Sequence, residues 1–144
     1  MFYALGDHTL YSYDGKKWYR LVIDGSYADI KDAVHSEAHH MSVLITSRAV
    51  YIKKDGGHSY EKAYENFDYS LGRIAEVDGV FAVAQEGSPS SALFSIDGRT
   101  WIRSNSNTKG QDMIVSGDHK FIYRETNSGV LYFSEKQNLN AETP

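Results

Sequence analysis

Three histidines and a glutamate lie in one short stretch and form the clearest candidate for a metal site. The residues are His35, Glu37, His39 and His40, and histidines four positions apart on a helix could hold zinc together. Related segments further along the chain read as plain turns, with the sequences Asp78-Gly79 and Gly117-Asp118-His119. The sequence therefore favours a polar turn at 35–40 and no metal, with zinc binding by these histidines as the alternative.

Carboxylates and arginines are numerous enough for hydrolytic chemistry, but no spacing pairs them. The chain has 19 aspartates and glutamates, and glycosidases use two such side chains at a defined separation. The sequence contains no G-x-S-x-G nucleophile elbow, no P-loop and no H-E-x-x-H motif. We therefore expect no catalytic residues and no cofactor.

Charge and composition narrow the possible partners. A net charge of -4 argues against a nucleic-acid binder, which normally carries a basic patch. The chain has no cysteine, which excludes disulfides and thiolate metal sites. Its apolar runs are too short to span a bilayer, and its first residues do not resemble a signal peptide. We expect one domain over 1–137 with a solvated tail over 138–144, in a cytoplasmic or virion-associated protein.

A turn motif recurs along the chain with a period of about 41 residues. Leu10-Tyr11-Ser12-Tyr13-Asp14-Gly15-Lys16-Lys17-Trp18 has a close copy in Leu93-Phe94-Ser95-Ile96-Asp97-Gly98-Arg99-Thr100-Trp101. A weaker copy, 50–60, lies between them and contains Asp55, Gly57 and Tyr60. Such repetition indicates an array of units, because one unit cannot bury its own apolar face.

Each repeat predicts four short strands. The first strand leads into the Asp-Gly turn (10–13, 50–52, 93–96), and the second follows it (18–23, 60–63, 101–103). The third comes after a polar connector (30–35, 71–77, 112–115), and a tight turn leads to the fourth (41–46, 80–85, 120–125). Segment 2–5 matches a fourth strand and 130–134 a first strand, so about three and a half units are present. Short, evenly spaced strands predict an all-β fold.

The turn motif resembles the Asp-box, or bacterial neuraminidase repeat, found on the blades of β-propellers. Ser95, Asp97, Gly98, Thr100 and Trp101 match its residue types. Ser12, Asp14, Gly15 and Trp18 match it as well, with a lysine in place of threonine, and Asp55, Gly57 and Tyr60 match it in part. The resemblance implies that these residues are structural: the aspartate satisfies turn amides, and the tryptophan packs as a plug between strands. The implied fold is a β-propeller-like array, with a β-trefoil as the alternative.

Asp-boxes occur in sialidases and also in proteins without enzymatic activity. The resemblance to sialidases would imply three arginines that clamp a carboxylate, but no local motif marks three of this chain's arginines as such a set. A glycan-active hydrolase therefore stays an alternative function. A regulatory protein that sequesters a partner or a small ligand is another.

In propellers, the face opposite the Asp-box turns carries the polar connectors and usually binds the ligand. Aromatic rings beside amides and arginines suit sugar or peptide recognition. On this face we expect as ligand-binding candidates Tyr27, Asp29, Arg48, Tyr64, Asn66, Tyr69, Arg103, Asn105 and Asn107.

The first and last strands would leave open sheet edges, which seek partners. We therefore expect a homo-oligomer formed through the terminal strands, because fewer than four blades do not close a ring comfortably. The preferred function is a non-enzymatic binding or structural protein, plausibly a phage or bacterial surface component, that recognises a glycan or a protein.

Overall fold

The regular structure of the chain is entirely β among the residues that can be described. The computed structural model describes residues 2–5, 9–23, 25–27, 29–65, 69–86, 92–103, 111–117, 119–125 and 131–133, and it contains no helix within them. The candidates Asn66, Asn105 and Asn107 and the expected tail at 138–144 lie outside these residues. The prediction of an all-β chain is confirmed for the described part.

Sixteen strands are present in this part of the chain. In chain order they are β1 (Phe2–Ala4), β2 (Leu10–Ser12), β3 (Tyr19–Arg20), β4 (Val22–Ile23), β5 (Ser26–Tyr27), β6 (Asp32–Ser36), β7 (Met41–Ile45), β8 (Ala49–Lys54), β9 (Glu61–Glu65), β10 (Ser70–Val77), β11 (Val80–Glu86), β12 (Ala92–Ser95), β13 (Ile102–Arg103), β14 (Gln111–Gly117), β15 (Lys120–Glu125) and β16 (Leu131–Phe133).

The strands form four antiparallel sheets and one small hairpin. The first sheet is β1-β2-β3, the second β6-β7-β8-β9, the third β10-β11-β12-β13 and the fourth β14-β15-β16, and β4 pairs with β5. The second, third and fourth sheets each start in the middle of the sequence repeat, with the strand that follows the polar connector, whereas the first sheet starts with β1, which matches a fourth strand. The reason is loop length: short turns keep strands in one sheet, whereas the longer connector crosses to the next sheet.

The predicted second strand at 18–23 is interrupted at Leu21. Its side chain turns into the core between the first two sheets, and its amide donates to the Thr9 carbonyl at 2.9 Å. Gly25, at φ 75°, then allows the tight β4–β5 hairpin within the segment expected to be a polar connector. Burial of the Leu21 side chain is therefore favoured over continuation of the strand through residue 21.

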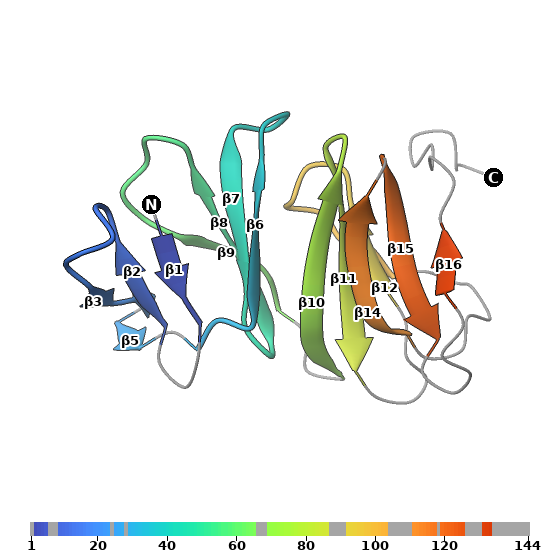
Figure 1. The fold of residues 1–144 in the computed structure, drawn as a ribbon, viewed down its shortest axis with the longest axis horizontal. Helices are drawn as coiled ribbons and strands as arrows, with labels where there is room; N and C mark the ends of the chain where they lie inside the picture. The colour runs from blue at the N-terminus through green and yellow to red at the C-terminus, as the bar shows by residue number, and fades with distance from the viewer. Residues whose placement is uncertain are drawn as a thin grey trace.

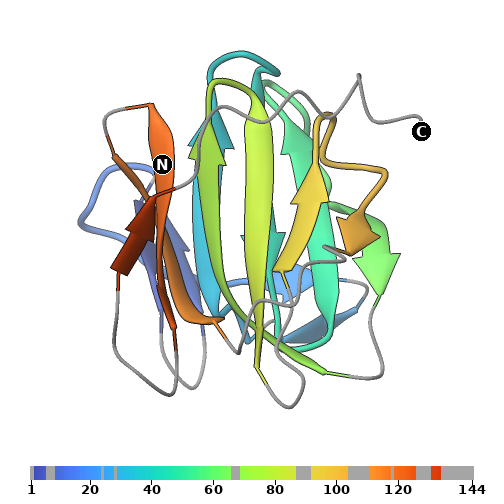
Figure 2. The same cartoon turned by 90° about the vertical axis from the view of Figure 1, so that its right-hand side faces the viewer.

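The four sheets stand face to face in a row (Figure 1). The first and fourth sheets lie at opposite ends of this row. In Figure 2 both end sheets fall to the same side of the two middle sheets, so the row is curved.

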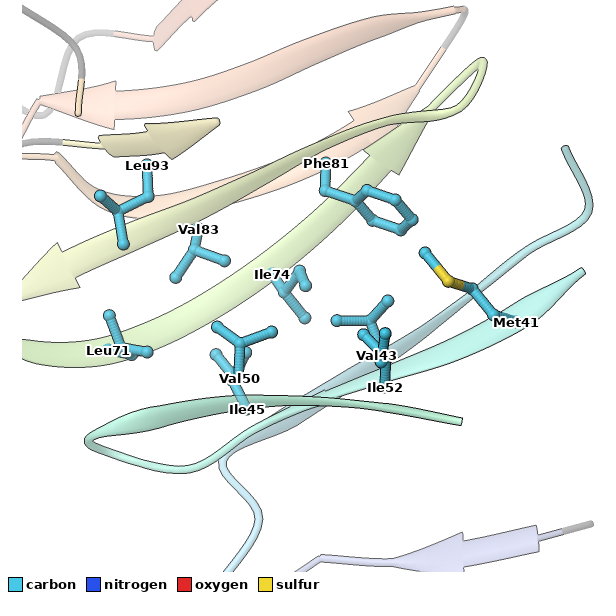
Figure 3. Close-up of a cluster of buried hydrophobic side chains, with 10 residues drawn as sticks. All are labelled: Met41, Val43, Ile45, Val50, Ile52, Leu71, Ile74, Phe81, Val83 and Leu93. Atoms are coloured by element: carbon cyan, nitrogen blue, oxygen red, sulfur yellow. The ribbon is translucent and has the colours of Figure 1, made fainter. Parts of the chain in front are cut away.

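Each junction between neighbouring sheets has its own apolar core. Ten buried side chains fill the junction of the second and third sheets, among them Val43 and Ile52 from one side and Phe81 and Leu93 from the other (Figure 3). Smaller clusters lie around Leu21 and Leu44 between the first two sheets, and around Ala82 and Phe121 between the last two. No sheet therefore buries its faces alone, as the repeat predicted.

Polar contacts also link one sheet to the next near the tight turns. The Ile74 amide donates to the Asp32 carboxylate at 3.0 Å, and the Ser36 hydroxyl donates to Glu76 at 3.3 Å. His39 Nε2 lies 2.8 Å from the Gly79 carbonyl oxygen. These polar contacts set the position of the third sheet relative to the second along the direction of the strands.

Candidate functional site

The Asp97 turn joins β12 to β13, and one carboxylate organises it. Asp97 Oδ1 accepts hydrogen bonds from the amides of Arg99 (2.8 Å) and Thr100 (2.9 Å) and from the Ser95 hydroxyl (3.0 Å). The Ser95 oxygen in turn accepts from the Gly98 amide at 2.8 Å. Burial alone would raise the pKa of Asp97, but these bonds together outweigh it and lower the pKa.

The Asp14 turn between β2 and β3 repeats this geometry. Asp14 Oδ1 accepts from the amides of Lys16 (2.8 Å) and Lys17 (2.9 Å), and the Ser12 oxygen accepts from the Gly15 amide at 2.8 Å. The amides of Lys17 and Lys16 lower the pKa of this carboxyl. Gly15 and Gly98 have φ angles of 75° and 78°, which only glycine adopts readily.

The middle turn, between β8 and β9, is built differently. Its left-handed glycine is Gly56, at φ 76°, and the Gly57 amide donates to the Lys54 carbonyl at 2.9 Å. Both carboxylate oxygens of Asp55 lie 3.0 Å from His35 Nε2. The Asp55 side chain thus faces a histidine of β6, where Asp14 and Asp97 face amides of their own turns.

Trp101 and Trp18 occupy the same place in their turns but have different surroundings. Trp101 packs against the core between the second and third sheets, near Tyr64 and Phe81, and its indole N–H donates to the Gly98 carbonyl at 2.9 Å. Trp18 is 41% exposed, so it does not form the expected plug between described strands. Trp101 is covered by the preceding sheet, whereas no described sheet precedes the first.

The candidate metal residues are separated by their local structure. His35 lies on β6 beside Asp55, while His39 belongs to the following turn and reaches Gly79. His40 has a left-handed backbone, with φ 50°. Within the described residues no group of three or more histidine, aspartate or glutamate side chains could hold a metal ion.

Some of the expected ligand-binding residues come together and others do not. The Arg103 guanidinium lies 5.5 Å from the centre of the Tyr69 ring, at the end of β13 and just before β10. Tyr64 instead packs against the core beside Trp101. Asp29 and Arg48 are exposed, and only the backbone of Tyr27 is described. The structure thus joins one pair of this set, Tyr69 and Arg103.

Two cavities open along the junction of the first two sheets. The first cavity, of about 480 Å³, is lined by Tyr11, Tyr13, Arg20, Leu21, Val22, Ile23, Lys53, Gly57, His58, Ser59 and Tyr60. The second cavity, also about 480 Å³, is lined by Tyr3, Ala33, Val34, His35, Ser42, Leu44, Lys53, Asp55 and Gly56. Lys53 lines both, so its side chain separates them.

Tyrosine rings make up the aromatic wall of the first cavity. Tyr11 lies edge-on to Tyr13, with ring centres 5.6 Å apart, and 5.5 Å from Tyr19. The Lys53 ammonium lies 5.8 Å from the centre of the Tyr60 ring, a distance that suits a cation–π contact. Arg20 and Lys53 line this cavity together with His58, and none of the described residues in the lining is a carboxylate.

The Tyr3 and Tyr60 hydroxyls are hydrogen-bonded to each other across the two sheets. Burial raises the pKa of Tyr60, and its bond to Tyr3 raises it further. Burial also raises the pKa of Tyr3. Both phenols therefore stay protonated at neutral pH and offer neutral hydrogen-bonding groups between the cavities.

The fold has counterparts among solved structures. YCF48 from Cyanidioschyzon merolae matches with a TM-score of 0.56 and 20% identity, over 74% of this chain and 36% of that one. A structure of YCF48 bound to D1 peptide matches with a TM-score of 0.56 and 18% identity, over 72% and 35%. The chain thus spans about a third of the length of these proteins. No protein-family model and no curated protein matches the sequence.

The fold is β-propeller-like. Successive antiparallel sheets, each joined to the next by a connector and packed on its face, are the blades of a propeller. The β-trefoil alternative is not the arrangement observed. At these identities the likeness concerns the fold and says nothing of activity.

Sequence reasoning missed the two cavities. It placed the ligand on the connector face, because the tyrosines at 11, 13 and 60 were assigned to strands and turns. The signal available was the run of tyrosines at 11, 13 and 19 beside lysines, yet their partners at 53 and 60 come from the next sheet.

No helix able to cross a membrane is found in the part of the chain that is described.

Proposed function

We propose that this chain is a non-enzymatic binding protein that recognises an acidic peptide segment of another protein. The observation that carries the proposal is the first cavity, where Tyr11, Tyr13 and Tyr60 lie beside Arg20 and Lys53. Tyrosine and arginine are enriched where proteins bind each other. The cationic side chains of Arg20 and Lys53 in this lining favour a negatively charged ligand.

The chemistry of the cavity suits binding better than catalysis. The buried Tyr60 phenol holds its proton, because its pKa is raised, so it is a poor base or nucleophile at neutral pH. Protonated phenols and an ammonium group donate hydrogen bonds to carboxylate and carbonyl oxygens. A peptide offers both kinds of oxygen.

The likeness to known structures agrees with a peptide ligand. One of the two neighbours was solved bound to a D1 peptide. Because the identity is 18%, this is an analogy between proteins of one fold, and the residues of the cavity must carry the argument here.

A labelled sample of the protein, applied to a random peptide library and to a glycan array, tests the proposal. We expect acidic peptides to be retained, and Tyr13→Ala and Lys53→Gln each to weaken the best of them about tenfold, as loss of about 1.4 kcal/mol would. Tyr69→Ala is the matched control, since Tyr69 lies beside Arg103 and outside the cavity. Retention of glycans alone would favour the carbohydrate alternative, and equal binding by all three variants would contradict this site.

We also propose that copies of the chain associate with one another. Among the side chains that the structure describes, six of the eight large hydrophobic ones that are markedly exposed belong to residues 2–22, in or next to the first sheet. Exposed apolar surface concentrated in one region marks a protein interface. Light scattering that gives the mass of a single chain at all concentrations would contradict this proposal.

A further inference from the structure

The first sheet has two faces, and their exposed side chains differ in surroundings. Tyr11 and Tyr3 point to the second sheet, where they join the apolar cluster between the two sheets, and Tyr13 lines the first cavity on that side. Because side chains alternate along a strand, Phe2, Leu10 and Trp18 belong to the other side. We call Phe2, Leu10 and Trp18 the outer face.

The outer face repeats a face that is fully covered elsewhere in the molecule. Phe2 pairs with Ser12 in the first sheet as Phe81 pairs with Ser95 in the third. Both serines begin the same turn, so Phe2 stands in the position of Phe81, Leu10 in that of Leu93 and Trp18 in that of Trp101. Phe81 and Leu93 are buried against the second sheet, whereas Phe2 is 55% exposed.

The turn above the outer face has the same shape as its covered counterpart. In both turns the aspartate holds two amides and the serine holds the glycine amide. A Cβ placed on Gly98 would lie 3.6 Å from the Phe81 ring of its own sheet and would also meet Met41 and Ile52 of the second sheet. A Cβ placed on Gly15 would lie 3.8 Å from the Phe2 ring of its own sheet and would meet no other described residue within 4 Å. The outer face therefore has the same turn geometry as the face of the third sheet that packs against the second sheet.

The surface that fits such a face is the opposite side of another sheet of this chain. In the second sheet that side is formed by Met41, Val43 and Ile52. The paired residues of each hairpin can be counted from its tight turn. Val43 belongs to the third pair in the second sheet, Ala82 to the third pair in the third sheet, and Ile122 to the third pair in the fourth sheet. Val43 and Ala82 each face the sheet that follows, and after the fourth sheet no further described sheet follows.

We propose that the outer face of the first sheet binds the fourth sheet of a second copy of this chain, on the side of Ile122. This inference rests on the proposed self-association and not on the peptide site. The first and fourth sheets of one chain lie at opposite ends of the row (Figure 1), so a single chain does not bring them together. Propellers have about four to eight blades, and two chains of four sheets reach eight.

Two such contacts, related by a twofold axis, close the assembly as a head-to-tail ring. The new junction is then of the same kind as those between the second and third and between the third and fourth sheets: the face that carries Phe2, Phe81 or Phe121 meets the side that carries Ile122, Val43 or Ala82.

Light scattering of single variants tests the surface. We expect the unchanged protein to have the mass of two chains, and Phe2→Asp and Trp18→Asp each to halve it. Both side chains are exposed within one chain, so the variants should keep the β circular-dichroism spectrum. Ile102→Asp is the matched control, because Ile102 is 58% exposed on β13 of the third sheet, and it should keep the mass of two chains.

The outcomes separate this inference from the self-association on which it rests. A one-chain mass for the unchanged protein overturns both. A two-chain mass that survives Phe2→Asp and Trp18→Asp leaves self-association standing and overturns the outer face.

Cross-linking tests which surface covers the outer face. The chain has no cysteine of its own, so Phe2→Cys and Ile122→Cys place single thiols. We expect a short bifunctional maleimide to join Phe2→Cys to Ile122→Cys chains when the two are mixed. Linkage of Phe2→Cys chains only to one another would show that two first sheets meet, and would overturn the head-to-tail arrangement.

Discussion

At the scale of single residues, the turn aspartates show how a short motif dictates backbone shape. Asp97 and Asp14 each accept two amides that follow them by two and three positions. A glycine between them supplies the left-handed conformation. Because all these hydrogen bonds join residues of one turn, the local sequence is sufficient to determine the backbone shape of the turn.

Replacing Asp97 by alanine removes the acceptor for two amides and a hydroxyl. We expect the free energy of unfolding to fall by about 1 kcal/mol, as for the loss of a capping side chain. Urea denaturation at neutral pH measures it. Asp97→Asn keeps one carbonyl oxygen and should lose less.

Asp97→Asn should also change how the free energy of unfolding depends on pH. Because the folded-state pKa of Asp97 lies below its ordinary value of 3.8, its carboxylate contributes stability above that value, and the contribution is lost as the pH falls through the lower folded pKa. Unfolding curves between pH 7 and pH 2 should therefore converge for the wild type and Asp97→Asn at the acid end. Parallel curves would contradict the assignment.

The two tryptophans give a matched pair. Trp101→Ala should cost about 3 kcal/mol, because the indole packs against Tyr64 and Phe81 and large buried aromatics cost about that much. Trp18→Ala should cost under about 1 kcal/mol within a single chain, as exposed positions do. Urea denaturation of both variants under conditions where the chain is monomeric checks the difference, and equal losses would contradict it.

At the scale of elements, the unit that packs is the sheet and not the sequence repeat. Tight turns and the Asp-Gly turns keep the strands of one sheet together, whereas β9 is followed along the chain by β10 of the next sheet. The Asp97 turn also docks on the preceding sheet, where Arg99 Nη1 donates to Glu61 Oε1 at 2.9 Å. A turn thus serves both its own hairpin and the junction beside it.

Glycine replacements separate these two roles. Gly56 has a φ angle of 76° and open space around it. Gly56→Ala should therefore lower the free energy of unfolding only by the backbone cost of about 1 kcal/mol. Gly98→Ala, at φ 78°, must also displace the Met41 methyl and approach Phe81, which adds about 1 kcal/mol or more. Thermal or urea unfolding measures both, and equal losses would show that the turn does not press on the second sheet.

Removing residues 130–144 deletes β16 and leaves β15 as a sheet edge. An open edge pairs with other chains, and the fourth sheet loses part of the surface proposed to bind the outer face. We expect the deletion to change the sedimentation profile of the protein. An unchanged profile would contradict a role of this terminal strand in association.

At the scale of the whole molecule, the row of four sheets buries three junctions and leaves two end faces. The junctions share one plan, with apolar side chains from both sheets meeting in each. The chain spans about a third of its structural neighbours, so it holds a part of the array that those chains contain. The end faces decide what else the molecule contacts.

Association through the end faces should make thermal stability depend on concentration. Ligands and partner subunits that bind only the folded chain raise the unfolding temperature by mass action. We expect the melting temperature to rise when the protein is concentrated, and Trp18→Asp to abolish the rise. Calorimetry over a hundredfold range of concentration tests this, with Ile102→Asp as the control.

The sequence by itself determined most of the strands, the two Asp-Gly turns and the all-β class, because each depends on residues a few positions apart. It did not predict the break at Leu21 or the β4–β5 hairpin. The tertiary structure alone decided which side chains meet across the sheets. It placed Tyr60 and Lys53 against Tyr3 and Tyr11, and it covered Trp101 while exposing Trp18. The physical reason is that burial belongs to a junction between sheets, and one turn cannot encode whether a neighbour is present to cover it.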